Sequence, residues 1–177
     1  KDDSDRVVEL YSTAFLWGPE EVRKLMRALH NNRSKQVLNL LNNNVGSNGA
    51  AVLGEALRTN TSVLKLNLGD NGIGPEGATA LGEALRVNTS LQELQLLDNP
   101  IGSRGAAALG EALRVHTSLQ ELNLSRNDID FRSAAVLGRA LLDSISLQEN
   151  AHSAPRWLRA ATLRRARRNE PQGTAAK

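Results

Sequence analysis

A 28-residue unit repeats through the middle of this chain, and it limits the possible folds more than any other feature. Residues 60–87 have the sequence NTSVLKLNLGDNGIGPEGATALGEALRV, and residues 88–115 have NTSLQELQLLDNPIGSRGAAALGEALRV. In this alignment, 19 of the 28 positions are identical. Similarity at a fixed period of about 20–50 residues indicates a solenoid, in which each unit buries its apolar face against its neighbours. Solenoids mostly present surfaces, so the repeat favours a binding role.

The same phase extends on both sides of these two units. It continues upstream over residues 35–59 and downstream over residues 119–146. A further unit begins at Leu147 and then fails, because Asn150 and His152 occupy positions of core leucines. The sequence therefore predicts four units over residues 35–146, which is more than the roughly three that a stable array needs.

The first part of each unit has the pattern of a short strand followed by a turn. In residues 64–68, Leu66 and Leu68 alternate with polar Lys65 and Asn67, which is typical of a half-buried strand. Asn71 follows, and a side-chain amide at such a position can bond to the backbone groups of a turn.

The second part of each unit has helical spacing. Ala78, Leu81, Gly82 and Leu85 recur at intervals of three and four residues. Glycine recurs in mid-helix at positions 54, 82, 110 and 138, where it costs about 1 kcal/mol relative to alanine. Its recurrence at one position predicts that helices of adjacent units approach each other closely there.

The pattern from Val63 through Leu66, Leu68, Asn71 and Ile73, followed by a helix, resembles a leucine-rich repeat. The length of the unit and its full helix resemble the ribonuclease-inhibitor-like subclass, which includes repeat regions of NOD-like receptors and of activating proteins for the Ran GTPase. This resemblance covers roughly residues 35–146. It implies an α/β solenoid, a short right-handed horseshoe with parallel strands on the concave face and helices on the convex face. The subclass hosts unrelated binding roles, so the resemblance implies fold more than function.

The two ends of the chain depart from the repeat. We interpret residues 1–34 as an N-terminal cap with a helix that opens at Pro19 and runs through Leu29, in phase with the later helices. Residues 147–177 form a degenerate repeat and a basic C-terminal cap or tail. Residues 153–177 have a net charge of +6, whereas residues 1–152 have a net charge of −3.

The basic tail has several interpretations. Our preferred one is that Trp157 and Leu158 cover the open end of the last unit while the arginines stay solvated. The alternatives are nucleic-acid binding, a nuclear localisation signal and a disordered segment. Nucleic acid is expected as a partner only through this tail, since the arginines have no interleaved aromatic residues beyond Trp157.

Composition excludes several classes of function. The chain has no cysteine, which excludes a disulfide framework, a thiolate nucleophile and cysteine metal sites. It also separates the chain from ribonuclease inhibitors, which are rich in cysteine. No apolar run approaches 18 residues, so we expect no membrane span. We expect an intracellular, cytoplasmic monomer.

The outward positions of the strands are the candidate binding residues. Stacking of the units aligns them in columns, of which one is uniformly an amide and the others vary. A binding array on a fixed scaffold has this pattern, although drift at solvated positions produces it as well, and stacked amides can instead form a stabilising ladder. If the face binds, we expect a protein partner with a basic, partly apolar patch. The candidate partner-binding residues are Lys65, Asn67, Asp70, Glu93, Gln95, Leu97, Asp98, Glu121, Asn123 and Arg126.

Catalytic signals are weak. His30, His116 and His152 are isolated, and His116 takes the position that Asn60 and Asn88 hold in the preceding units. We therefore predict no catalytic residue, no cofactor and no metal site. The leading hypothesis is a protein-interaction scaffold. The alternatives are a small-GTPase regulator of the Ran-activating type and an engineered or consensus-like solenoid without a natural partner.

Overall fold

The computed structural model describes residues 6–9, 17–30 and 36–146. In these residues strands and helices alternate strictly along the chain. The elements are β1 (Arg6–Glu9), α1 (Pro19–His30), β2 (Gln36–Asn39), α2 (Gly46–Leu57), β3 (Val63–Asn67), α3 (Pro75–Leu85), β4 (Glu93–Gln95), α4 (Gly102–Leu113), β5 (Glu121–Asn123) and α5 (Phe131–Ser146).

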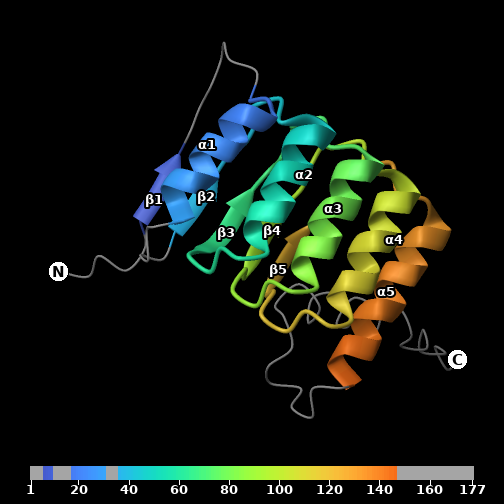
Figure 1. Cartoon of the computed structure of the whole chain (residues 1–177). Coiled ribbons are helices and arrows are strands. Elements are labelled where there is room, and N and C mark those ends of the chain that lie inside the picture. Colours follow the sequence, from blue (N-terminus) through green and yellow to red (C-terminus); the bar gives the residue numbers. More distant parts are fainter. Residues whose placement is uncertain (1–5, 10–16, 31–35, 147–177) are drawn as a thin grey trace, which may run out of the picture.

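The strands form one parallel sheet in chain order, from β1 to β5. The helices lie side by side as a second layer against this sheet (Figure 1). Leu66 pairs with Leu94 and Leu94 with Leu122, so paired residues of β3, β4 and β5 are 28 positions apart. The predicted α/β solenoid is therefore confirmed in the described residues.

The core is a continuous strip between the two layers. Its strand side consists of residues such as Leu66, Leu68 and Leu94, and its helix side of residues such as Leu81 and Leu85, all of them buried. Ile73 is fully buried as well, so the turn after each strand folds back onto the core as the pattern indicates. Because each unit contacts only its neighbours, this strip replaces the single central core of a globular domain.

The N-terminal segment continues the array with a strand as well as a helix. The predicted helix is confirmed as α1, and its Val22 and Met26 are buried in the common core. β1 pairs with β2 in parallel register, which the sequence did not predict. The backbone N–H of Trp17 donates to the carbonyl of Asn43, which ties this segment to the next unit. The predictions for the tail, including the cap function of Trp157 and Leu158, lie outside the described residues.

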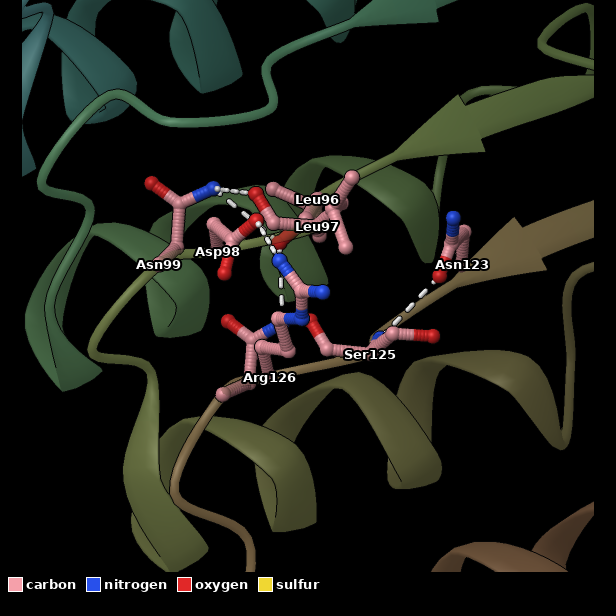
Figure 2. A network of polar contacts seen from close by, with 8 residues as sticks. Leu96, Leu97, Asp98, Asn99, Asn123, Ser125 and Arg126 are labelled. Atoms are coloured by element: carbon pink, nitrogen blue, oxygen red, sulfur yellow. Dashed lines mark hydrogen bonds and ion pairs between the residues drawn. The ribbon is translucent and has the colours of Figure 1, made fainter.

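A buried row of asparagines joins successive units through their side chains. Asn99 Oδ1 accepts hydrogen bonds from the backbone N–H groups of Asn71 and Ile73, at 3.1 and 2.9 Å. Asn99 Nδ2 donates to the carbonyls of Leu96 and Leu97, at 3.0 and 3.1 Å (Figure 2). It also donates to the carbonyl of Leu68 in the preceding unit, at 2.9 Å. One side chain thus binds backbone groups of its own unit and of the preceding one.

Asn71 repeats this arrangement one unit earlier. Its Oδ1 accepts from Asn43 and Val45 N–H at 3.0 and 3.2 Å, and its Nδ2 donates to the carbonyls of Leu40 and Gly69, both at 2.8 Å. Asn127 departs from it. Its Nδ2 donates to the carbonyls of Leu96 and Ser125, both at 2.9 Å, but its buried Oδ1 has no partner.

The departure at Asn127 is explained by Pro100. The preceding unit has Gly72 at this position, with a φ of 65°. Proline cannot adopt a positive φ, so the turn takes another path. The N–H of Ile101 then donates to the carbonyl of Asn99 at 2.8 Å. The equivalent N–H in the preceding unit, that of Ile73, bonds to the asparagine of the next unit instead.

The recurring glycines allow close contact between helices, as predicted, at Gly54 and Gly82. A Cβ added to Gly54 would lie 2.9 Å from the carbonyl oxygen of Ala80, and a Cβ on Gly82 would lie 2.9 Å from that of Ala108. At Gly110 the nearest atom is 3.5 Å away, on Leu137. At Gly138 nothing lies within 4 Å, so this glycine of α5 has no such packing role in the described residues.

We expect Asn99→Ala to destabilise the array by about 2–4 kcal/mol, because it leaves several buried backbone groups without a partner. Asn127→Ala should cost less, since only Nδ2 of Asn127 makes hydrogen bonds. Asn48→Ala, at an exposed position of α2, serves as the control and should be close to neutral. Urea unfolding measures all three. An equal cost for Asn99→Ala and Asn48→Ala would contradict the role of the ladder.

Gly82→Ala and Gly138→Ala form a second matched pair. Alanine gains about 1 kcal/mol of helix propensity at both positions. At Gly82 the new methyl group meets a backbone carbonyl, so we expect a net destabilisation of about 1–3 kcal/mol. Gly138→Ala meets no atom within 4 Å and should be stabilising. Thermal unfolding of the two variants should therefore shift in opposite directions, and a shift in the same direction would refute the packing argument.

Candidate partner-binding face

The sheet register aligns the predicted columns on the face of the sheet that turns away from the helices, which we call the strand face. Lys65 pairs with Glu93, and Glu93 with Glu121. In the amide column, Asn67 pairs with Gln95 and Gln95 with Asn123. All of these side chains are half-buried, because each lies against its neighbours in the adjacent strands. The structure thus brings together six of the ten candidate residues in two adjacent columns.

Contacts between strands hold these side chains in place. Lys65 Nζ lies 2.9 Å from Glu93 Oε1, and Gln95 Nε2 donates to Glu121 Oε1 at 2.8 Å. The second bond runs diagonally between the two columns. A shallow hollow of about 200 Å³ lies beside these contacts, lined by Val37, Lys65 and Gln95 among others. The face is therefore ordered before any partner arrives, which lowers the entropic cost of binding.

The amide column does not form the ladder that the sequence suggested. Asn39, Asn67 and Asn123 each accept a hydrogen bond from a backbone N–H two residues later in their own chain segment, at 3.1, 3.0 and 3.0 Å. Figure 2 shows this bond between Ser125 N–H and Asn123. In the described residues no hydrogen bond joins two side chains of this column. The prediction of an amide ladder at this column is wrong, and the ladder lies in the buried row of Asn71 and Asn99.

The backbone conformation explains the residue types in the fourth column, which lies in the turns after the strands. Asn42, Asp70, Asp98 and Arg126 have φ angles of 55°, 52°, 54° and 55°. Asparagine and aspartate tolerate this left-handed region better than other non-glycine residues, so three of the four satisfy the turn. Arg126 is the exception, and its Nη1 lies 3.3 Å from Asp98 Oδ2 (Figure 2).

A partly exposed apolar side chain, Leu41, lies at the rim of the strand face. A Cβ on Gly69 would lie 2.9 Å from Leu41 Cδ1 and 3.5 Å from the carbonyl oxygen of Leu97. Leu41 therefore leans over Gly69 and remains 38% exposed. Exposed Asp70 follows directly in the chain. The candidate residues include Leu97 but not Leu41. Leu41 has the same outward position in its unit as Leu97, so the sequence could have identified it as well.

The candidate residues carry two bases and four acids, a net charge of −2. Two of the acids, Glu93 and Asp98, have an ion-pair partner within the set. Among the described residues no group of three histidine, aspartate or glutamate side chains is placed to hold a metal ion. No helix of the described chain is long and apolar enough to cross a membrane. The strand face thus offers recognition by charge and by an apolar rim.

His116 lies away from this face, in a second row of inter-unit contacts. Asn88 Nδ2 donates to the carbonyls of Leu57 and Asn60 of the preceding unit, at 2.7 and 3.0 Å. His116 takes the equivalent position and is only 6% exposed. Its Nε2 lies 3.3 Å from the carbonyl of Leu91, while its Nδ1 has no partner. Burial lowers the pKa of His116, and the backbone hydrogen bonds oppose the shift without cancelling it. The predicted role of a polar residue at a helix end is confirmed.

The lowered pKa of His116 predicts a loss of stability in acid. The folded state holds this ring neutral below pH 6.5, where the unfolded chain takes up the proton. Stability should be complete above about pH 6.5 and fall as the pH drops through the folded pKa. His116→Asn should remove this part of the pH dependence. Urea unfolding from pH 8 to 5 measures it, and parallel curves for the two proteins would contradict the prediction.

Comparison with known proteins agrees with this architecture. A family model described as leucine-rich repeat matches residues 59–82, 87–110 and 115–132. The fold is a leucine-rich repeat solenoid. No curated protein sequence matches the chain.

Two solved leucine-rich repeat structures are similar over most of the chain. The structure titled "Leiomodin-1 Actin-Binding Site 2 (ABS2)" has a TM-score of 0.63 and 20% identity, covering 94% of this chain and 89% of that one. The tropomodulin C-terminal domain of Caenorhabditis elegans has a TM-score of 0.62 and 19% identity, covering 93% of this chain and 92% of that one. At these identities the likeness concerns the fold.

Proposed function

We propose that this leucine-rich repeat solenoid is a protein-interaction module that binds its partner through the strand face and its rim. The observation that carries the proposal is the set of contacts between strands, in which Lys65 is paired with Glu93 and Gln95 with Glu121. These contacts hold varied polar groups in fixed positions on a repeating scaffold. A surface whose side chains are already held in place can bind another protein without rearrangement.

The rim defines the chemistry of the partner. Leu41 covers Gly69 and remains partly exposed, and Asp70 lies exposed beside it without an ion-pair partner in the described chain. An apolar side chain that packs against Leu41, with a lysine or arginine next to it, would satisfy both features. The net charge of −2 on the candidate residues favours the same basic, partly apolar patch.

The size of the face limits the strength of binding. Strands about 4.8 Å apart give this array a width of roughly 15–20 Å. An interface of this width lies near the lower end of the standard size of about 800 Å² per partner. We therefore infer a modest affinity that weakens as salt is added.

The similar structures guide the choice of a first partner to test. The leiomodin-1 structure is titled as an actin-binding site, so actin is the first defined protein to try against this chain. We further propose that the repeats are of the ribonuclease-inhibitor-like subclass, and that the chain is an intracellular monomer without enzymatic activity. The alternative is a small-GTPase regulator of the Ran-activating type, and stimulation of GTP hydrolysis by the chain would favour it.

A charge and shape reversal on the strand face tests the proposal. The face variant combines Glu93→Lys, Leu97→Asp and Glu121→Lys. The control variant makes the same three types of change on the exposed helix side, with Glu83→Lys, Val87→Asp and Glu111→Lys. Circular dichroism confirms that each variant is folded. Binding to actin, and to proteins captured from cell lysate and then purified, is measured at low and high salt.

We expect the control variant to keep the native affinity and the face variant to lose at least tenfold. A purified partner that binds the face variant as well as the native chain would contradict the proposal. Capture of no partner by the native chain would favour the alternative of a solenoid without a natural partner.

A further inference from the structure

A groove of about 270 Å³ runs between α1 and α2, on the helix layer. It lies on the other layer of the solenoid from the strand face and shares no residue with the candidate set. Its apolar lining includes Met26, Val52 and Ala56, and its polar lining includes Arg23, Arg27 and Glu55.

The groove has a cause in the sequence. Met26 occupies in α1 the position that Gly54 and Gly82 occupy in α2 and α3, at intervals of 28 residues. At both glycines the missing side chain lets the backbone of the next helix approach to contact distance. The Met26 side chain has to be accommodated at that point, so α1 and α2 cannot pack in the same way.

Exposure of the equivalent alanines shows the effect. Ala84 of α3 and Ala112 of α4 are buried under the preceding helix, at 1% and 0% exposure. Ala56 holds the same position in α2 and remains half-buried. The alanine position that is covered in the two later helices is therefore partly open in α2.

The charges at the groove are unevenly compensated. Arg23 pairs with Glu20, and Glu55 pairs with Arg58. Arg27 is exposed and has no ion-pair or hydrogen-bond partner among the described residues. The groove thus combines an apolar floor with one uncompensated guanidinium group, which binds carboxylates in a two-pronged geometry.

We propose that the groove between α1 and α2 is a second docking site, for an acidic peptide segment that inserts one large apolar side chain. A volume of 270 Å³ is below the roughly 300–1,000 Å³ of pockets that hold whole small molecules. It suits a single leucine or aromatic side chain. A neighbouring carboxylate of the segment pairs with Arg27, and methionine in the floor adapts to the shape of the inserted group.

The test uses the full chain and a blocked peptide in which a leucine–tryptophan pair is flanked on both sides by glutamates. Two control peptides replace the glutamates by lysines, or the apolar pair by serines. Binding is followed by amide chemical shifts in NMR spectra, which also locate the site. Ala56→Leu fills the groove, Arg27→Glu reverses its charge, and Arg86→Glu makes the same charge change at an exposed position of the α3 end.

We expect the acidic apolar peptide to shift amides of α1 and α2 and both control peptides to bind at least tenfold more weakly. Ala56→Leu and Arg27→Glu should each weaken binding at least tenfold, and Arg86→Glu should leave it unchanged. Equal binding of the lysine peptide, shifts confined to other elements, or an unchanged affinity of Arg27→Glu would overturn the proposal. Because Arg27 is exposed, its substitution keeps the test valid even if Ala56→Leu does not fold.

Discussion

The array depends on the hydrogen bonds that buried asparagine side chains make to the backbones of two neighbouring units. A parallel strand in a short repeat is followed by a tight turn, whose N–H and C=O groups are buried and need partners. Asn71 and Asn99 supply those partners from the next unit along the chain. The turn of one unit is therefore completed only when the following unit is present. Nearest-neighbour dependence of this kind makes a solenoid cooperative although it has no central core.

This constraint leaves the outward side chains free to vary. The inward leucines and the buried asparagines fix the register of β3, β4 and β5, so any residue beside them faces outward at a known position. The strand face uses that freedom for charge pairs and an apolar rim. In the helix layer the residue type is restricted instead, because only glycine at positions 54 and 82 lets adjacent helices pack this closely. The helix α1, which has methionine at that position, borders the groove.

The sequence predicts the repeated elements well because their signals are local and periodic. Alternation in residues 64–68 and helical spacing from Ala78 to Leu85 place β3 and α3, and addition of 28 residues gives the columns. The sequence does not predict which of two nearby asparagine side chains bonds to the buried backbone groups of the turn. Asn67 ends β3 and Asn71 follows it in the turn, yet only the side chain of the buried Asn71 bonds to the preceding unit. The strand β1 went unpredicted because a segment of four residues shows little periodicity. The unpartnered Oδ1 of Asn127 follows from Pro100 in the preceding turn, an effect that needs the three-dimensional pairing.

Amide hydrogen exchange of the native chain tests most directly whether these side chains hold the array together. The N–H groups of Asn43, Val45, Asn71 and Ile73 lie in turns, where exchange is ordinarily fast, but each donates to an asparagine side chain of the next unit. If the ladder joins the units, these four amides should exchange as slowly as those of the central strands, through global unfolding. Exchange at the rate of exposed turns, with the strands still protected, would show that the units are held together without it.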